Sequence, residues 1–431
     1  MPLAQSNYWL TTTSMPAATT GEFPSSADVA VIGAGFTGLS AAHTLAKRGV
    51  KVVVLESNTI GWGASSRNGG MVLTGLKLSP ETLADRYGLE RTRQMYAASL
   101  SSINLLEQIV REENIDCNFS RCGHLEVASK QSHFDSYARA VEFIASEFRH
   151  RLDIIPRNKL HEEIGSSLYY GGMLDESSAG VNPASYVRGL ATAALRAGAA
   201  IYENATVRQI EHTTRATDQG FAVRTDRGSL FVRDILVGTS GYTTAVTQEL
   251  QKKVIPIGSF IIATERLSDS LARELSPRNR MIFDSKHFLH YYRLTPDNRM
   301  LFGGRAAFFP ETKNTIGRSA RILRRDMVEV FPQLRDTPIA YAWGGTLDFC
   351  FDTMPHAGVI NGIHFALGYA GHGVAMATYL GSKMAERILG SREEIPYATI
   401  PFPGAPLGRY NGRPWFLAFA GAYYKVLDWI S

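Results

Sequence analysis

Cysteine and long apolar runs are both scarce in this chain of 431 residues. Its three cysteines, Cys117, Cys122 and Cys350, are too few and too irregularly spaced for a disulfide framework or a zinc cluster. We therefore expect a reducing compartment and no metal site. No window reaches eighteen uninterrupted apolar residues, so no membrane-spanning helix is predicted. The first 26 residues lack a basic region followed by an apolar one, which argues against a secretory signal and favours a cytoplasmic protein.

Charge of one sign is not concentrated anywhere in the chain either. The formal net charge of +5 is mild for this length, and lysine and arginine are scattered, so nucleic acid is not an expected partner. With 45% apolar and 20% charged residues, the composition is that of an ordinary globular protein. The length allows two domains with a large buried core.

The most informative segment that is present is ADVAVIGAGFTGLSAAHTLAKRGVKVVVLE, residues 27–56. It has the pattern of a strand, a glycine turn, a helix, a second strand and a terminal acid. Gly33, Gly35 and Gly38 form G-x-G-x-x-G, in which the first glycine permits a tight turn, the second a close approach to pyrophosphate, and the third close helix–strand packing. Free N–H groups at the helix N-terminus suit phosphate, and Glu56 can accept hydrogen bonds from ribose. We predict a dinucleotide-binding unit.

Three later segments are of the kind that surrounds a cofactor larger than a nicotinamide dinucleotide. GWGASSRNGGMV (61–72) follows the second strand and can offer successive backbone N–H groups to phosphate or to the polar edge of a ring. DILVGTSGY (234–242) is an apolar strand that ends in small residues. NGIHFALGYAGHGVAMATYLG (361–381) leads through a glycine-histidine-glycine turn into a helix whose N-terminus can face an electron-rich ring carbonyl.

In their order along the chain, the blocks VIGAGFTGLSAA, GWGASSRNGG, YYRLTPDNRMLFGGR, WGGTLDFCFDTMPHAG and GYAGHGVAMA resemble those of the FAD-dependent amine oxidases of the D-amino-acid oxidase family. The resemblance covers roughly residues 28–389. It implies an α/β (α+β) fold of the D-amino-acid oxidase and glutathione-reductase type, in which a Rossmann-like FAD-binding domain with a parallel sheet accompanies a substrate domain with a mainly antiparallel sheet.

On this basis we divide the chain into an N-terminal arm (1–26), a discontinuous FAD-binding domain (27–115, 175–245 and 340–395), a substrate domain (116–174 and 246–339) and a C-terminal tail (396–431). The arm is small, polar and proline-punctuated from residue 11 onward, and we expect it to run irregularly over the surface. One strand is predicted over residues 200–211.

The resemblance also implies which residues bind FAD. The adenosine end would lie at Gly33 to Gly38 and Glu56, the adenine at the backbone of Val207, and the pyrophosphate side beneath Thr239. Residues 64–71 and 371–374 would surround the isoalloxazine ring. The full set is Gly33, Gly35, Phe36, Thr37, Gly38, Glu56, Ser57, Gly63, Ala64, Ser65, Arg67, Asn68, Gly69, Gly70, Met71, Val207, Thr239, Gly368, Gly371, Gly373 and Val374. The alternative for each is an ordinary turn glycine or core residue.

The reaction that the resemblance implies is oxidation of an amine to an imine, which water hydrolyses, with O₂ reduced to H₂O₂. The amine would be a polyamine, a γ-glutamylputrescine-like compound or a secondary amino acid. Because the cofactor performs the redox step, a dedicated catalytic base is optional.

Four residues are candidates for contacts with the substrate or the reactive ring: Tyr292, Arg293, Trp343 and His372. Strand alternation sends Tyr291 and Arg293 to one face and Tyr292 to the other. Arg293 could clamp a substrate carboxylate or form a surface ion pair. Trp343 could be an aromatic wall or a core tryptophan, and His372, between two glycines, is expected to face the flavin.

Two departures from the resemblance matter for mechanism. Sarcosine oxidases carry a lysine near the flavin on the strand similar to MLFGGR and another after the glycine-histidine-glycine turn, and Phe302 and Ala375 stand at those places here. Oxygen activation by lysine is therefore in doubt. Those enzymes also attach flavin through a cysteine, but the spacing of Cys350 to Asp352 is wrong for that role, so we expect noncovalent FAD.

The C-terminal tail ends in a helix-compatible run whose only charges after Arg413 are Lys425 and Asp428. A helix apolar nearly all round is buried or meets lipid, so this run could pack on the protein, on a subunit partner or on the inner face of a membrane. The tail and the missing lysines keep open an FAD dehydrogenase that passes electrons to a membrane quinone. A noncatalytic FAD-binding subunit of a larger oxidase is the third possibility.

Overall fold

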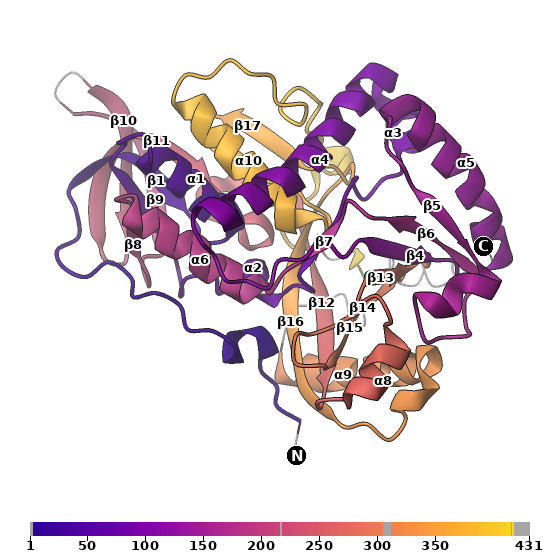
Figure 1. Ribbon diagram of the computed structural model, residues 1–431. Helices are drawn as coiled ribbons and strands as arrows, with labels where there is room; N and C mark the ends of the chain where they lie inside the picture. The colour runs from indigo at the N-terminus through magenta and orange to yellow at the C-terminus, as the bar shows by residue number, and fades with distance from the viewer. Residues whose placement is uncertain (1–2, 216–217, 305–311, 415, 418–431) are drawn as a thin grey trace.

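The computed structural model describes residues 3–215, 218–304, 312–414 and 416–417 (Figure 1). Two eight-stranded sheets account for most of its strands. The predicted α/β fold with one parallel and one mainly antiparallel sheet is confirmed. The predicted apolar helix of the C-terminal tail lies largely outside the described residues.

The first sheet is built around the predicted strand–helix–strand unit. Its strand order is β17-β18-β11-β1-β2-β8, and β9 and β10 join through β11. The pairs β18–β11, β11–β1, β1–β2 and β2–β8 are parallel. The strands are β1 (Ser26–Ile32), β2 (Val52–Leu55), β8 (Ala200–Tyr202), β9 (Val207–Arg215), β10 (Asp218–Thr225), β11 (Gly228–Val237), β17 (His356–Ile360) and β18 (Ile363–Leu367).

Four helices form the core on one side of this sheet: α1 (Phe36–Ala46), α4 (Leu89–Glu112), α6 (Pro183–Arg196) and α10 (Gly373–Ile388). Figure 1 shows α1 and α10 close together beside the sheet, with α4 crossing in front. The apolar run of β1 and β2 is buried on both faces, as expected for central parallel strands. This packing brings the N-termini of α1 and α10 to the same edge of the sheet.

The second sheet has the order β16-β12-β15-β14-β13-β4-β6-β5, and all its pairs are antiparallel except β13–β4. One face packs on α8 (Asp269–Leu275) and α9 (Lys313–Val330). The strands are β4 (His124–Val127), β5 (Asp153–Pro156), β6 (Gly171–Asp175), β12 (Val254–Thr264), β13 (Met281–Asp284), β14 (His290–Leu294), β15 (Met300–Gly304) and β16 (Ile339–Cys350).

Shorter elements connect the two sheets. The two-stranded sheet β3 (Met71–Val72) and β7 (Ala179–Gly180) lies between them. The remaining helices are α2 (Ala64–Arg67), α3 (Pro80–Tyr87), α5 (Gln131–Phe148) and α7 (Gln248–Gln251), with 3₁₀ turns η1 (Tyr8–Thr11), η2 (Arg157–Glu162), η3 (Ser240–Tyr242), η4 (Ala245–Thr247), η5 (Pro332–Leu334) and η6 (Pro406–Gly408).

Two sequence-based boundaries are wrong. The strand predicted over residues 200–211 is two strands, β8 and β9, because Asn204 at φ 51° turns the chain between them. Residues 340–350 were assigned to the FAD-binding domain, but β16 pairs with β12 along its whole length and so belongs to the second sheet. The rest of the domain division stays a prediction. No helix within the described ranges is long and apolar enough to cross a membrane.

Candidate cofactor and substrate site

A cleft with about 1360 Å³ of empty space, partly open to solvent, lies at the carboxyl ends of β1, β2 and β11. The residues that line it come from four segments that sequence analysis singled out, together with parts of β16 and the turns after β8 and β11. Among the predicted cofactor residues, those in the lining are Gly33, Gly35, Phe36, Thr37, Glu56, Ser57, Gly63, Ala64, Ser65, Asn68, Val207, Thr239, Gly371, Gly373 and Val374.

The glycine turn between β1 and α1 is sterically closed to larger residues. Gly33 has φ +102°. A Cβ on Gly38 would lie 1.9 Å from the carbonyl oxygen of Gly33, and one on Gly35 would lie 2.8 Å from the Ser65 hydroxyl. Gly38 therefore serves close helix–strand packing and lies outside the cleft lining, whereas Gly35 opens the backbone to the cleft.

Glu56, at the end of β2, is held by two backbone hydrogen bonds. Its Oε2 accepts from the N–H of Ala34 at 2.8 Å, and its Oε1 accepts from the N–H of Asn58 at 2.9 Å. The carboxylate thus braces the glycine turn while it also faces the cleft.

The N-termini of α1 and α10 both open into this cleft. Their N-cap residues are Gly35, which has no side chain, and His372, whose side chain accepts no hydrogen bond from the first turn. The N–H of Phe36, the first residue of α1, donates to the Ser65 hydroxyl at 2.9 Å. The first N–H groups of a helix have no intrahelical acceptor, and the helix dipole makes that end attractive to anions. Both helices therefore direct N–H groups of their first turn toward one space. The Thr37 and Tyr369 hydroxyls, 2.7 Å apart, tie the two helix starts together.

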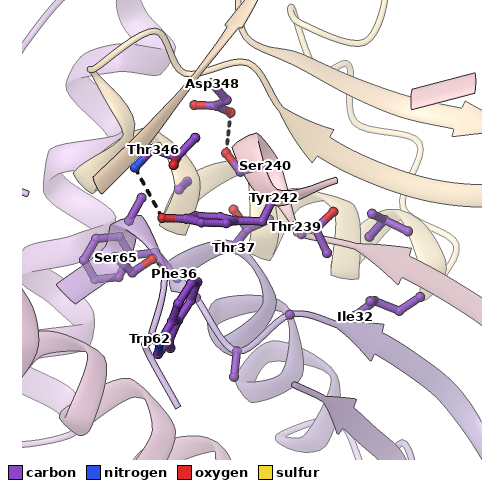
Figure 2. Close-up of a pocket in the computed structure, with 18 of the residues that line it drawn as sticks. Ile32, Phe36, Thr37, Trp62, Ser65, Thr239, Ser240, Tyr242, Thr346 and Asp348 are labelled. Carbon is purple, nitrogen blue, oxygen red and sulfur yellow. Dashed lines mark hydrogen bonds between the residues drawn. The ribbon is translucent and has the colours of Figure 1, made fainter. Parts of the chain in front are cut away.

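Side chains from the far wall close the cleft. Figure 2 shows Tyr242 reaching across it, so that its hydroxyl accepts a hydrogen bond from the N–H of Thr346 at 3.3 Å. Ser240 donates to the buried carboxylate of Asp348, which also accepts the Gly368 N–H at 2.5 Å. Gly368 has φ +88° and a Cβ there would lie 2.4 Å from the Cys350 sulfur, so this glycine serves packing and is not in the lining.

Comparison with known proteins identifies the family. The family described as FAD dependent oxidoreductase (DAO) matches residues 28–387. The chain belongs to this family. Gamma-glutamylputrescine oxidoreductase of Escherichia coli is 33% identical over 404 residues, which cover 93% of this chain and 92% of the relative. Probable oxidoreductase OrdL of Haemophilus influenzae is 32% identical over 93% of this chain and 92% of its own length.

A solved structure supports the same fold. Glycine oxidase from Geobacillus kaustophilus superposes with a TM-score of 0.72 at 19% identity, over 89% of this chain and 99% of its own. The family and FAD as cofactor, predicted from the sequence blocks, are therefore confirmed. The cleft fits FAD on physical grounds, because the bare glycine turn and two helix N-termini suit a pyrophosphate and an electron-rich ring. Which residues touch it stays a prediction.

The segment 64–71, which we predict to lie beside the flavin ring, is tightly held. Trp343 Nε1 donates to the carbonyl oxygen of Arg67 at 2.9 Å, and Arg293 Nη1 donates to that of Gly70 at 3.1 Å. Arg67, Gly70 and Met71 lie behind the lining. Gly69 packs there against an aromatic ring, because its Cβ would lie 3.0 Å from Tyr291.

The structure corrects two of the catalytic candidates. Tyr292 lies in the core beneath the second sheet, where it stacks on Phe302 at 5.4 Å and its hydroxyl donates to Tyr169 at 2.9 Å. Arg293 forms neither a carboxylate clamp nor a surface ion pair within the described chain. Its buried guanidinium donates to the backbone carbonyls of Gly70 and Val181, and burial lowers its pKa to about 10. Alternation placed these neighbours on opposite faces correctly, but gave Tyr292 the wrong role.

The other two candidates lie closer to the predicted ring position. Trp343 is 1% exposed and packs in a small core with Trp9, so the core-tryptophan alternative holds. His372 is the N-cap of α10, and its Nδ1 is buried without a partner in the described structure. Burial, with a smaller contribution from Lys77, lowers the pKa of His372 to about 3, so the imidazole is neutral at physiological pH.

One face of the second sheet is turned toward the segment 64–71. Tyr291, on this face, contacts Gly69. In β4, Leu125 and Val127 join the core with α9, so His124 and Glu126 point to the opposite face. His124 stacks on Phe283 at 5.3 Å. Burial raises the pKa of Glu126 to about 7, against the opposing effect of Lys77.

The positions associated with lysine and cysteine chemistry are also buried. Phe302 points into the core of the second sheet, and the residues of β15 on the opposite face are Leu301 and Gly303. Ala375 is 3% exposed within α10. Cys350 lies in the core, does not line the cleft, and burial raises its thiol pKa well above the usual value. Noncovalent attachment of FAD stays a prediction.

Sequence reasoning missed several residues of the lining. The main ones are Asn58, Trp62, Thr206, Ser240, Tyr242, Thr346, Leu347, Asp348 and Tyr369. A local signal existed for Trp62, Ser240, Tyr242 and Tyr369, since all four lie in the segments 61–72, 234–242 and 361–381 that are predicted to surround the cofactor. Asp348 and its neighbours belong to a strand of the other sheet, and only the folded chain brings them to the cleft.

Proposed function

We propose that the protein is an FAD-dependent amine oxidase whose substrate is a γ-glutamylated diamine or a related polyamine. The amine is oxidised to an imine, water hydrolyses the imine to an aldehyde and an amine, and O₂ is reduced to H₂O₂. The observation that carries the proposal is the convergence of two helix N-termini on a cleft lined by the bare glycine turn after β1. The relative at 33% identity, named for γ-glutamylputrescine, supports the substrate class.

In the proposed arrangement, the adenosine half of FAD lies beside Glu56 and Val207, and its pyrophosphate at the N-terminus of α1. The ring lies between the segment 64–71 and the N-terminus of α10. Bound there, FAD would supply the two-electron oxidation of the amine and the reduction of O₂. The chain's own residues orient the amine and exclude water.

We place the substrate against the face of the second sheet that carries Tyr291, Phe283 and Glu126. The two aromatic rings suit a methylene chain. Glu126 has no ion pair in the described part of the protein, and a half-buried carboxylate is suited to a substrate ammonium group. Lys77 acts electrostatically on both Glu126 and His372.

None of the groups near the proposed ring position is a strong base at neutral pH. His372, with its pKa lowered to about 3, takes up no proton, and burial raises the pKa of Tyr291 to about 12, so its phenol stays protonated. The amine therefore reaches the ring already neutral, and desolvation by the aromatic face favours that form.

The absence of lysine from the face of β15 opposite Phe302 favours a second candidate, an FAD dehydrogenase that delivers electrons to a quinone. Leu301 and Gly303 occupy that face. For the dehydrogenase we would expect the tail to contact a membrane or a subunit. For the oxidase we would expect a cytoplasmic location.

The test is anaerobic reduction of the bound flavin by a panel of putrescine, γ-glutamylputrescine, N-methyl amino acids and cyclic imino acids, followed by O₂ uptake. Fast uptake with the amine that bleaches flavin supports the oxidase, and turnover only with a dye or quinone supports the dehydrogenase. If no amine bleaches the flavin, the remaining interpretation is a noncatalytic FAD-binding subunit. Glu126→Gln should raise KM for substrates with a second ammonium group about tenfold or more, whereas Glu142→Gln, on an exposed position of α5, should not.

A further inference from the structure

Four backbone carbonyls in or beside the segment 64–71 are each bound by a side chain from elsewhere in the chain. Trp343 and Arg293 bind those of Arg67 and Gly70. The other two donors come from the N-terminal arm. Asn7 Nδ2 donates to the carbonyl oxygen of Ser66 at 2.8 Å, and Trp9 Nε1 donates to that of Asn68 at 2.9 Å.

These carbonyls belong to the end of a one-turn helix. α2 ends at Arg67, and the last carbonyls of a helix have no partner within it. Asn7 and Trp9 supply the missing donors at a place where Trp9 is 0% and Asn7 7% exposed, so water does not replace them. An unsatisfied buried carbonyl would be costly, which makes these two contacts decisive for the local conformation.

Holding the carbonyls fixes the direction of the next N–H groups. In a trans peptide the C=O and the following N–H point in opposite directions. With the carbonyls of Arg67 and Asn68 drawn toward Trp343 and Trp9, the N–H groups of Asn68 and Gly69 point the other way. Asn68 lines the cofactor cleft, so these donors are presented to that side.

The arm itself is anchored on the second sheet. Ala4 pairs with β16, donating to Ala340 O and accepting from Ala342 N, both at 2.9 Å. Tyr8 donates to Asp297 in the turn between β14 and β15. Asn7 Oδ1 accepts from the Trp9 N–H at 3.0 Å, which fixes η1. Residues 7–9 of the arm are buried and connect the second sheet with the segment 64–71.

We propose that Asn7 and Trp9 are positioning residues for FAD: they hold the segment 64–71 so that its N–H groups face the ring. This inference rests on the ring position given in the proposed function. It assigns the N-terminal arm, which the sequence predicts only to run over the surface, a role in cofactor recognition.

The experiment compares three variants of the full chain. Trp9→Phe keeps an aromatic ring but removes the donor to Asn68. Asn7→Asp keeps the acceptor for the Trp9 N–H but replaces the donor to Ser66 with an acceptor. The matched control is Tyr8→Phe, which loses the bond to Asp297 from the same buried turn without touching the segment 64–71.

The readouts are the dissociation constant for FAD, measured by titrating apoprotein, the shape of the bound flavin's visible spectrum, and the Tm of the apoprotein. We expect Trp9→Phe and Asn7→Asp to weaken FAD binding about tenfold and to alter the spectrum. Tyr8→Phe should lower only the Tm. Equal FAD affinity in all three, or an equal loss in all three that follows the Tm, would overturn the proposal.

Two safeguards keep the test decisive. Should Trp9→Phe not fold, Asn7→Asp answers the same question without creating a cavity. FAD affinity and spectrum are measured without any amine, so a protein that binds FAD but oxidises no amine refutes the proposed reaction and not the positioning role.

Discussion

Asp348 accepts a hydrogen bond from the hydroxyl of Ser240, although one residue lies on β16 of the second sheet and the other in the turn after β11 of the first. The same carboxylate oxygen accepts the Gly368 N–H at 2.5 Å. One buried carboxylate thus joins three segments around the cofactor cleft. Burial raises its pKa, and the hydrogen bonds from Ser240 and Gly368 oppose that rise.

Asp348→Asn should therefore weaken FAD binding as well as stability. The amide oxygen of asparagine can replace the oxygen that both donors share, but it carries no full negative charge, so both hydrogen bonds become weaker. We expect a loss of about 1.5 to 3 kcal/mol, the range for hydrogen bonds to a charged group. Ser240→Ala, which leaves the bond to Gly368 in place, should cost less. FAD titration and thermal unfolding measure both, and a smaller loss for Asp348→Asn than for Ser240→Ala would contradict this account.

Glu56→Gln should weaken FAD binding by about 1.5 to 3 kcal/mol, because it removes the charge from a group that faces the ribose in the proposed arrangement. Glu203→Gln is the matched control. Glu203 also holds a backbone N–H with its carboxylate, that of Ile60 at 2.7 Å, but it does not line the cleft. Fluorescence titration with FAD should separate the two, and equal losses would mean that the effect is structural.

His290 provides a pH test of the second sheet. Burial alone would lower the pKa of His290, but its hydrogen bonds with Asp284 and Asp326, both 3.2 Å, raise it to about 9. A histidine whose pKa is higher in the folded state stabilises the protein fully below about pH 6.5, and this contribution disappears as the pH rises through 9.

His290→Asn should consequently lower the free energy of unfolding by about 2 to 3 kcal/mol at pH 6 and by much less at pH 10. The exposed His161, changed to Asn, should have little effect at either pH. Urea unfolding at the two pH values provides the comparison. A loss that is the same at both would show that the charge of His290 is not what stabilises the sheet.

The proposed reaction has its own pH dependence. Keeping an amine of pKa about 10.4 neutral at pH 7 costs about 4.6 kcal/mol. If no group in the site removes that proton, the rate of flavin reduction at low substrate should rise about tenfold per pH unit between roughly pH 6.5 and 8.5. Stopped-flow reduction without oxygen measures this rate. A flat profile would mean that a residue of the chain acts as base, and Glu126, with its pKa raised to about 7, would be the first to test.

What could be predicted from the sequence was the part of the site that local pattern determines. The unit from β1 to Glu56 is continuous in sequence, so hydrophobic periodicity and glycine spacing were sufficient to find it. The boundary at residue 340 was misplaced, and the local sequence does little to correct it, because glycines such as Gly344 and Gly345 are unfavourable within a strand. In the fold they lie within β16, where Gly345 packs against Arg67.

The remaining parts of the site depend on long-range packing. Alternation correctly separated Tyr291 from Tyr292, but it could not tell which face meets the cofactor domain. Nothing in the sequence around Arg293 indicates whether its guanidinium binds a carboxylate or donates to backbone carbonyls. Trp9 lies 59 residues before its partner Asn68, in a segment with no periodicity. Such contacts follow from how the sheets pack and leave no trace in local sequence.

The attachment of the N-terminal arm has a consequence for the order of folding. Residues 4–12 are synthesised long before most of their partners, which include Asn182, Asp297 and the strand residues Ala340 and Ala342. Their docking closes some of the longest loops in the chain. Such contacts form late in folding, because the entropic cost of closing a long loop must be met before the contact contributes any stabilisation. The proposed cofactor site is therefore completed only after the N-terminal residues 4–12 have docked on residues near position 340.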